Sequence, residues 1–501
     1  MKKYILASLV ATVATTGTIY AQSYAPDAFR FSQMNYGSTA RFKAMGNAQI
    51  GVGGDIGSIS SNPAGLGMFT KSEFSITPEF NAVSNKNAFL GTETKSDKNQ
   101  INLNNIGVVF YSPTFKAKGS DVNKGLLSAV FGLSYNRNND FFNNIHYSGT
   151  NTNSSIRDAY AEQANDYGVD NTIAGDAYNS LLINNNAPNY PNVFSAEPYG
   201  TTSFNQDWAE SRLGSTSEVN VAGALNFSNK LYIGATASFV NVRYISDASF
   251  TESGILNNFD EGTQQYEGNE DYGLTHFRNQ ETKGSGINLK IGMIFRPVNE
   301  FRIGLNFQTP TWMNVEDYTS ETVNSSLSGF NSNNSSRDYT FTYNLRTPLK
   351  ASAGASYVFG GKALISADVD YIDYSSMRFS ADDGSDISTI NSTNAFIKND
   401  YKEAINYRMG AEFKVNDALS LRAGYGVNGN GVKDGDNSFY QTQYYTGGLG
   451  YRVSNYYFDL TYQNSQTNFS SSPYELSDYS EPVADIKNNR NNVFLTFGVR
   501  F

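Results

Sequence analysis

The sequence predicts an all-β protein: a transmembrane antiparallel β-barrel of about fourteen strands whose lumen is plugged by an N-terminal hatch. Three observations predict it: apolar and polar residues alternate in many short segments, the joints between these segments alternate between short and long, and only 17% of the residues are charged. We divide the chain into a signal peptide at residues 1–21, a hatch at residues 22–71, and a barrel with long extracellular loops at residues 72–501.

The composition excludes several classes of protein. Apolar residues make up 39% of the 501 residues, against about 45–50% in ordinary soluble proteins, while 44 Gly, 34 Tyr and 34 Phe are abundant. The lack of Cys excludes a disulfide framework, a thiolate metal site and a catalytic Cys, and two His leave little for histidine-based chemistry. A net charge of −10 argues against nucleic acid as a partner, because no surplus of basic residues exists to neutralise phosphates.

The first 21 residues have the pattern of a signal peptide. Lys2 and Lys3 form a charged start, residues 5–19 form an apolar stretch, and Ala21 is a small residue before the expected cleavage site. The alternative, a membrane anchor, requires a longer segment with charges after it. Beyond residue 21 no stretch reaches the ~20 consecutive apolar residues of a spanning helix, so this chain can cross a membrane only with strands.

Residues 22–71 lack strand alternation and are rich in Gly. Glycines in residues 45–46, 51–54 and 61–67 permit tight bends, and Pro63 fixes the backbone angle within the last of these runs. We therefore expect this segment to fold compactly inside the lumen. The alternative is a disordered tail on the periplasmic side.

The final strand shows the alternation most clearly. Its apolar face carries Val493, Leu495, Phe497, Val499 and Phe501, and its other face carries Asn492, Thr496, Gly498 and Arg500, with Phe494 as the exception. We expect the apolar face to contact lipid and the other face to line the lumen. A soluble sandwich alternates in the same way, so the lengths of the loops must separate the two folds.

Fourteen segments are predicted as strands, an even number. They are residues 72–84, 103–113, 125–137, 216–228, 230–245, 286–297, 300–312, 338–359, 362–378, 399–415, 418–430, 440–453, 455–468 and 490–501. Pro348 lies inside one of them, which leaves open whether that segment is one strand or two. The joints at 228–229, 297–299, 360–361, 416–417 and 454 are tight turns, whereas those at 138–215, 246–285, 313–337, 379–398 and 469–489 are long and polar. Short turns at one rim and long loops at the other are typical of an outer-membrane barrel.

Two of the long loops carry further features. Residues 156–167 and 174–182 are predicted as short helices. The apolar residues of 156–167 fall at helical spacing, so this helix has an apolar face that either collects ligand or packs on neighbouring loops. The loop at 246–285 contains eight acidic and two basic residues. Such a charge repels a carboxylate, which counts against a fatty acid as ligand, although a solvated surface loop has the same composition.

The string Asn62-Pro63-Ala64-Gly65-Leu66, placed after a Gly-rich stretch and before the first strand, resembles the FadL/TodX family of outer-membrane transporters for long-chain fatty acids and other hydrophobic compounds. Residues 295–310, 365–374 and 408–425 support the resemblance, whereas the long outer loops do not. The resemblance implies a fourteen-stranded barrel with a hatch, capture of ligand in the outer loops and transfer to a pocket near the hatch. It also implies release of ligand sideways through a gap beside a kinked third strand.

The hatch motif and one glycine are the first candidates for functional residues. Asn62, Pro63, Ala64 and Gly65 are expected to hold the turn of the hatch, and Gly132 in the third strand is the candidate for the lateral-gate kink. A small lumen-facing residue that makes room for the hatch explains Gly132 equally well.

Charged residues on lumen-facing positions are the second group of candidates. Asp368 and Asp370 share the parity opposite to the apolar residues of their strand, so both should face the lumen. We expect them to pair with Arg408 or Arg422 from nearby strands, as lumen electrostatics and not as catalytic acids.

These observations predict passive uptake of hydrophobic small molecules, such as long-chain fatty acids, across the outer membrane of a Gram-negative bacterium, through a lumen that the hatch gates. The expected partners are the ligand, outer-membrane lipids and lipopolysaccharide, and the barrel-assembly machinery, which would recognise the C-terminal Phe501. No catalytic residue, metal site or cofactor is predicted. The alternatives are a binding or adhesion protein, a haem uptake protein, for which His146 and His276 are a weak signal, and a barrel enzyme, for which no Ser-His-Asp set is evident.

Overall fold

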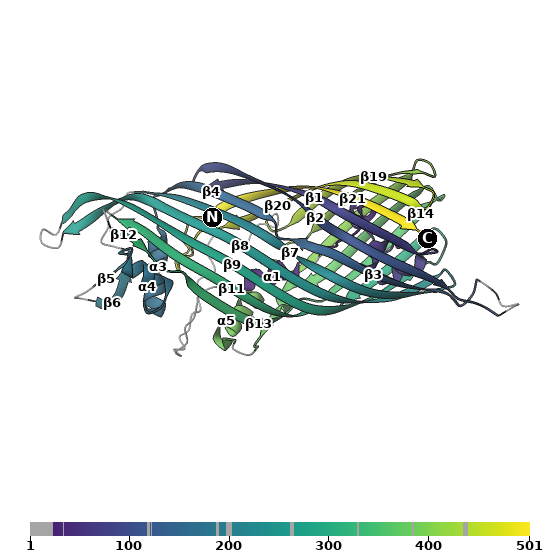
Figure 1. Ribbon diagram of the computed structural model, residues 1–501, viewed down its shortest axis with the longest axis horizontal. Coiled ribbons are helices and arrows are strands. Elements are labelled where there is room, and N and C mark those ends of the chain that lie inside the picture. Colours follow the sequence, from purple (N-terminus) through teal and green to yellow (C-terminus); the bar gives the residue numbers. More distant parts are fainter. Residues whose placement is uncertain are drawn as a thin grey trace.

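The computed structural model describes residues 24–33, 35–117, 121, 123–186, 190–196, 203–260, 265–327, 330–382, 385–433 and 439–501. They form a closed antiparallel β-barrel with the N-terminal residues inside it (Figure 1). The sheet closes because β1 (Glu73–Phe89) pairs with both β2 (Thr92–Pro113) and the last strand, β21 (Ala484–Arg500). The predicted fold class is confirmed, while the signal peptide expected at residues 1–21 lies outside the described residues.

Besides β1, β2 and β21, the wall contains the segments β3 (Leu126–Asp140), β4 (Asn143–Asn151), β7 (Phe204–Phe227), β8 (Leu231–Asp260), β9 (Gln265–Phe295), β10 (Phe301–Gln308), β11 (Trp312–Leu327), β13 (Arg337–Arg346), β14 (Lys350–Phe359), β15 (Ala363–Asp373), β16 (Arg378–Ser380), β17 (Glu403–Lys414), β18 (Leu419–Asn428), β19 (Thr442–Val453) and β20 (Tyr456–Ser471). In the described part of the chain these segments form fourteen strands, four of which are broken into successive halves: β3 and β4, β10 and β11, β13 and β14, and β15 and β16. β12 (Phe330–Asn333) extends the hairpin of β11, and β5 (Asn184–Asn186) pairs with β6 (Tyr190–Ser195) in an outer loop. Pro348 falls in the break between β13 and β14, so the expected segment is one interrupted strand and the number stays at fourteen.

The two rims of the barrel differ. At one rim the turns are tight: Ser228 and Asn229 have φ of 58° and 55°, and Gly360 and Gly361 have φ of 52° and 73°. Positive φ at both central residues is the geometry of a two-residue hairpin turn. Both ends of the barrel domain also lie at this rim, where Arg500 binds Glu73 at 2.6 Å. The long loops lie at the opposite rim, which is called the outer rim here.

Two of the expected outer loops are mostly strand. β8 and β9 stay paired out to residues 260 and 265, so most of the expected loop 246–285 is a hairpin, which extends past the neighbouring wall in Figure 1. β11 likewise reaches residue 327, well into the expected loop 313–337. These boundaries were predicted wrongly because a strand outside the membrane has no lipid-facing side, and so it lacks the apolar alternation by which strands were recognised.

The third barrel strand separates from β2 near the outer rim, while its outer half, β4, stays paired with β7. β3 pairs with β2 up to Asn136, and beyond that point no backbone ladder joins β2 to β4 in the described part of the chain. Instead, lumen-facing side chains of β1 and β2 donate to β4 carbonyls: Asn87 Nδ2 to His146 O (2.8 Å) and Ser96 Oγ to Asn144 O (2.7 Å). β4 therefore lies against the lumen side of the β1–β2 hairpin.

The two faces of the wall follow the predicted alternation. In β15, Ile365 and Val369 are 50% and 43% exposed toward the lipid side, whereas Asp368 is buried on the lumen side. Phe494, the exception in the last strand, is also buried, and its ring centroid lies 4.9 Å from Nζ of Lys43 in the N-terminal segment.

Helices occur inside the barrel and in the outer loops. They are α1 (Ala25–Ser32), α2 (Ala40–Ala44), the 3₁₀ helices η1 (Ile56–Ile59), η2 (Pro63–Met68) and η3 (Tyr374–Ser376), α3 (Ile156–Tyr167), α4 (Ile173–Asn179) and α5 (Ile387–Asp400). α3 and α4 confirm the two helices expected in the first long loop. Within the described ranges, no helix is long and apolar enough to cross a membrane.

Candidate functional site

The N-terminal segment, called the hatch here, crosses the lumen and contacts the wall on all sides. η2 lies against β7, β8 and β9, η1 lies against β1, β2 and β3, and α2 lies against β18, β19, β20 and β21. These elements are short because glycines interrupt them. α1 lies in the lumen nearer the outer rim, where it contacts α5.

Asn62 holds the expected turn of the hatch and joins it to the wall. Its Oδ1 accepts from the backbone N–H of Ala64 (3.2 Å), which caps η2. Its Nδ2 donates to the carbonyls of Ile50 in the hatch (2.7 Å) and Met293 in β9 (3.3 Å). Pro63 stands at the first helical position, where no backbone donor is needed.

The rest of the motif is packed tightly. Ala64 is fully buried beside Tyr232 and Ile294 of the wall. An added Cβ at Gly65 would lie 2.9 Å from Cα of Gly53, so only glycine fits where these two hatch turns cross. The motif therefore fixes one half of the hatch against β8 and β9.

A ring of wall glycines makes room for the hatch. At nine lumen-facing glycines, one from each of nine strands, an added Cβ would come within 3.0 Å of a hatch atom. They are Gly107, Gly132, Gly234, Gly292, Gly304, Gly354, Gly410, Gly424 and Gly448. The hatch is thus fitted to the wall at backbone level, and we call these residues the glycine ring.

Polar side chains of the wall satisfy the backbone of the hatch. Asp368 accepts from the backbone N–H groups of Gln49 (2.5 Å) and Ile50 (2.8 Å), and Ser366 Oγ donates to Ala48 O (2.9 Å). Thr236, Ser356, Thr446 and Thr461 donate in the same way to carbonyls of the hatch. Asp368 thus binds hatch backbone and neither of the two arginines expected as its partners, because backbone donors lie directly in front of it.

Asp370 forms a buried ion pair with Arg408. Nη1 of Arg408 lies 2.6 Å from Oδ2 of Asp370, and both side chains are at most 1% exposed. Nε of Arg408 donates to Tyr444 OH (3.0 Å). This pair joins β15, β17 and β19 across the lumen face of the wall.

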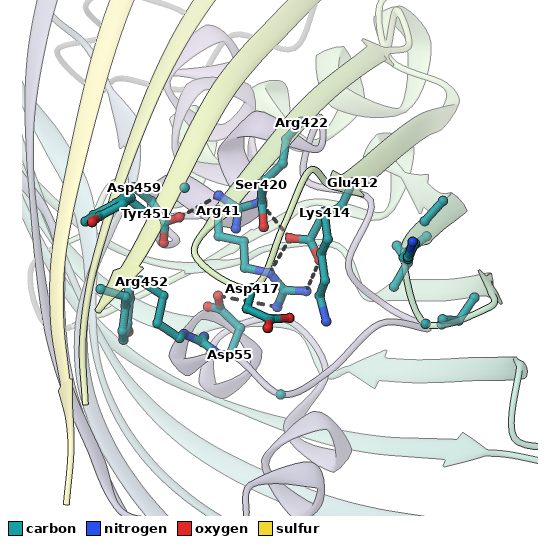
Figure 2. Close-up of a pocket in the computed structure, with 18 of the residues that line it drawn as sticks. Arg41, Asp55, Glu412, Lys414, Asp417, Ser420, Arg422, Tyr451, Arg452 and Asp459 are labelled. Carbon is teal, nitrogen blue, oxygen red and sulfur yellow. Dashed lines mark hydrogen bonds and ion pairs between the residues drawn. The ribbon is translucent and has the colours of Figure 1, made fainter. Parts of the chain in front are cut away.

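A charged cluster joins the hatch to the wall near the short-turn rim, and Figure 2 shows its residues. Arg41 of α2 binds Glu412 through Nε (2.9 Å) and Nη2 (3.2 Å). Arg422 binds the same carboxylate through Nε (2.6 Å) and Asp459 through Nη1 (2.5 Å). Arg422 thus pairs with these two residues and not with Asp368 or Asp370, and the cluster lines a cavity of about 430 Å³.

Asp55 is the buried carboxyl of the hatch itself. It caps η1 by accepting from Gly57 N (2.9 Å) and Thr39 Oγ1 (2.8 Å), and Nη1 of Arg41 lies 3.8 Å from its other oxygen. Burial raises the pKa of Asp55 to about 6, although Arg41 opposes the shift. The hatch therefore carries a carboxyl group that titrates close to neutral pH.

α1 occupies an apolar chamber in the outer half of the lumen. The chamber is formed by buried wall side chains, among them Val242, Tyr244, Met313, Val315, Tyr343, Leu345, Ile372 and Phe379. On α1, Phe31 packs its ring against Phe141 and Tyr244, with centroids 5.8 Å and 6.3 Å apart. The chamber also holds buried polar groups, since Gln280 donates to Asp27 of α1 (2.9 Å) and to Asp317 (2.8 Å). Lumens of transmembrane barrels are usually polar throughout, so the apolar part of this lining distinguishes the barrel from a water-filled pore.

A small cavity of about 30 Å³ lies beside α1 and is lined by two buried lysines. Lys290 binds Glu218 at 2.5 Å. Lys350 places Nζ 4.0 Å from the ring centroid of Tyr36, and among the described residues no carboxylate lies within 4.0 Å of this ammonium group. The chamber thus has a cationic group at its inner end.

Gly132 lies in a regular part of β3. An added Cβ there would lie 2.8 Å from Cδ1 of Ile59, so this glycine makes room for η1. The strand has two register shifts against β7, one between Leu126 and Ser128 and one between Arg137 and Asn139, and β3 ends at Asp140. Gly132 is therefore not at either register shift, and its role as a lateral-gate kink stays a prediction.

The outer helices and histidines have local partners. α3 and α4 bury their apolar faces against β8, β9 and β11. His146 Nε2 lies 2.8 Å from Asp207 Oδ2, and His276 Nδ1 lies 3.1 Å from Tyr160 OH. Glu252, one of the acids of the expected acidic loop, is buried and accepts from Gln206 Nε2 (2.7 Å). No group of three or more His, Cys, Asp or Glu side chains in the described ranges is arranged to hold a metal ion.

Sequence reasoning missed the glycine ring and the cluster around Glu412. A signal for both exists, because Gly410 and Glu412 share the lumen-facing parity of Arg408 in one strand. What the sequence does not contain is the position of the hatch, which gives these residues their partners.

Comparison with known proteins supports this architecture. The family described as outer membrane protein transport protein (OMPP1/FadL/TodX) matches residues 17–464. No curated protein matches the sequence.

Several solved structures share the fold. A FadL homologue of Pseudomonas aeruginosa is 11% identical, with a TM-score of 0.52 over 93% of this chain and 98% of that chain. The toluene transporter TodX of Pseudomonas putida is 13% identical, with a TM-score of 0.52 over 93% and 99% of the two chains. A deltaS2 mutant of the TodX monoaromatic hydrocarbon channel is 12% identical, with a TM-score of 0.53 over 93% and 99%. At such identities the structures show a common barrel, and the sequence match over most of the chain shows that this protein belongs to the outer membrane protein transport family, OMPP1/FadL/TodX.

Proposed function

We propose that this protein takes up hydrophobic small molecules across the outer membrane of a Gram-negative bacterium, by diffusion through a lumen that the hatch gates. The observation that carries the proposal is the apolar chamber around α1. A hydrophobic molecule in place of α1 would be buried by the same side chains, and each buried Å² contributes roughly 25 cal/mol.

The chamber lies between the outer loops and the rest of the hatch. The apolar cluster between α3, α4 and the β8–β9 hairpin supplies another apolar surface nearer the outer rim, and we place the first capture of ligand there. A molecule in the chamber has two routes out, and both are closed by contacts of the described residues. One requires movement of the hatch, and the other is the side of the barrel where β2 and β4 share no backbone ladder in the described residues, which supports sideways release at this break and not at Gly132.

A disulfide between hatch and wall tests the gating. The chain has no Cys, and an ideal Cβ at Gly448 in β19 would lie 2.6 Å from Cβ of Ala44 in α2. The variant A44C/G448C therefore brings two thiols together with an adjustment of about 1 Å. In proteoliposomes, the oxidised variant should lose uptake of a hydrophobic fluorescent probe and regain it on reduction.

The single variants A44C and G448C are the controls, since each adds the same side chain without the bond. They should show no dependence on the redox conditions. Full uptake by the oxidised double variant would exclude a hatch that must move on this side.

We further propose that the hydrophobic molecules include long-chain fatty acids, and this part of the proposal rests on Lys350. Its ammonium group has no carboxylate partner among the described residues and lies beside the chamber, where the carboxylate of a long-chain fatty acid can reach it. Lys350→Gln should lower uptake of a long-chain fatty acid and leave uptake of its methyl ester unchanged. Equal uptake of both compounds by the variant and the native protein would restrict the proposal to neutral ligands.

A further inference from the structure

The outer wall of the barrel carries a row of three lysines. Lys86 on β1 lies opposite Lys95 on β2 and opposite Lys487 on β21, and all three side chains are exposed on the outer face. Like charges directly opposite each other on neighbouring strands are destabilising. In a chain of net charge −10, three such lysines in one row indicate a place where an anion is held.

The carboxylates around the row compensate it only in part. Asp97 pairs with Lys95 at 3.1 Å, whereas no carboxylate in the described residues lies within 4.0 Å of Lys86 or Lys487. Glu93 and Asp485 lie in the next row toward the outer rim, where both are opposite the small residue Ala88. The central ammonium group, that of Lys86, is thus left without an ion pair.

Elsewhere on the outer wall, a carboxylate compensates two facing cations fully. Arg243 on β8 and Lys283 on β9 also face each other across the strands, and each binds the carboxylate of Glu281, at 3.1 Å and 3.2 Å. The lysine row is therefore not the general way in which this barrel places outer cations.

Amide side chains separate the lysine row from the lipid-facing surface. Below Lys487 on β21 stand Asn489 and Asn491, and Asn464 of the neighbouring β20 donates to both, at 2.7 Å and 2.9 Å. Below them Tyr462 is 50% exposed and donates to Asn491 at 2.5 Å. Amide groups beside an exposed ring can form hydrogen bonds and stacking contacts with the hydroxyls and faces of a sugar.

An apolar row follows at the level of Tyr462. It contains Phe80, Ile101 and Val493, which face outward on β1, β2 and β21. Lys86 lies six residues beyond Phe80 on the same strand. At a rise of about 3.3 Å per residue and a tilt of about 40°, the lysine row stands about 15 Å above the apolar row, at the level of lipid headgroups.

We infer that the outer wall of β20, β21, β1 and β2 binds a phosphorylated glycolipid of the outer leaflet. Its acyl chains lie on the apolar row, its sugars lie on the amides of β20 and β21, and a phosphate lies on Lys86 between Lys95 and Lys487. The site gives the expected lipopolysaccharide partner a defined place, and it is independent of what passes through the lumen.

The test measures binding of two matched lipids to the purified protein in detergent by native mass spectrometry. The probes are bisphosphorylated lipid A and monophosphoryl lipid A. The variant K86Q/K95Q/K487Q should bind the bisphosphorylated lipid at least about tenfold more weakly at low salt, because each cation near an anionic headgroup contributes several-fold in affinity. The native protein should bind the bisphosphorylated lipid more tightly than the monophosphoryl lipid, whereas K86Q/K95Q/K487Q should bind both lipids equally.

Two further variants complete the design. K86R/K95R/K487R keeps the charges and should keep the binding, and R243Q/K283Q removes outer cations from another part of the wall and should also keep it. Heat-modified mobility on a gel shows whether each barrel is folded. Affinity of the triple Gln variant within about twofold of the native value, or an equal loss in R243Q/K283Q, would overturn the inference.

Discussion

The side-chain oxygen of Asn62 occupies the space that a Cβ atom of residue 292 would fill on β9. Gly292→Ala should therefore push Asn62 out of its position and weaken docking of the hatch by about 1–3 kcal/mol, the usual cost of overpacking. We expect a higher ion conductance of the variant in planar bilayers. Gly447→Ala on β19, where nothing lies within 4 Å of an added Cβ, is the matched control and should not conduct more than the native protein. Equal conductance of the two variants would contradict this account of the glycine.

Asn62 itself offers a comparison of two substitutions. Asn62→Ala removes two donor bonds and the cap of η2, which should weaken the hatch by about 1–3 kcal/mol. Asn62→Asp keeps the cap but directs a carboxylate oxygen toward the carbonyls of Ile50 and Met293, so it should weaken the hatch more than Ala does. Maleimide labelling of a cysteine at the buried position Ala48 reports release of the hatch in each background. Slower labelling with Asp than with Ala would show that the donor bonds are unimportant.

The ion pair of Asp370 and Arg408 should behave as a unit. Arg408→Met leaves the buried carboxylate without its partner and should lower the free energy of unfolding by about 3–5 kcal/mol. The double variant D370N/R408M removes both charges and should recover most of that loss. Denaturant unfolding of the detergent-solubilised barrel, followed by tryptophan fluorescence, measures the cycle. A double variant as unstable as R408M would mean that the arginine acts through Tyr444 and not through the charge pair.

Acidification should hold the hatch more firmly. The docked hatch binds a proton at Asp55 with a pKa of about 6, against an ordinary value of 3.8 when the carboxyl is in water. Docking is therefore weakest above pH 6 and strengthens as pH falls from 6 toward 4, by up to about 3 kcal/mol.

The rate at which maleimide labels the cysteine of A48C measures this effect. The rate is measured with native Asp55 and with D55N, and the ratio of the two rates cancels the pH dependence of thiol ionisation. On acidification, labelling of the protein with native Asp55 should slow more than thiol ionisation alone explains, whereas labelling of the D55N protein should not. A constant ratio from pH 7 to pH 4.5 would exclude Asp55 as the titrating group.

The membrane-spanning part of the wall was predictable because lipid imposes a strict pattern on it. Ile365 and Val369 must be apolar, and Asp368 between them need not be, so the parity of β15 is readable from the sequence. Outside the membrane, both faces of a strand meet water or protein. The hairpin of β8 and β9 therefore has no such pattern beyond about residue 246, and it was predicted as a loop.

For the candidate site, the sequence predicts which side chains face the lumen but not which residues they contact. The lumen-facing position of Asp368 followed from parity, but its partners Gln49 and Ile50 are more than 300 residues away in sequence. No local rule connects residues that far apart. Gly132 illustrates the same limit: glycine permits a kink and also permits close packing, and the contact with Ile59 cannot be read from the sequence.

The glycine ring has a consequence for how such a protein can change over generations. Its members are spread from Gly107 to Gly448, and each matches one atom of a segment encoded ahead of all of them. The hatch of a distant relative would place its atoms at positions where this wall has side chains and not glycines. The barrel wall and the hatch must therefore evolve together. The outer loops are free of this constraint, so changes in the loops are the easier route to a new substrate.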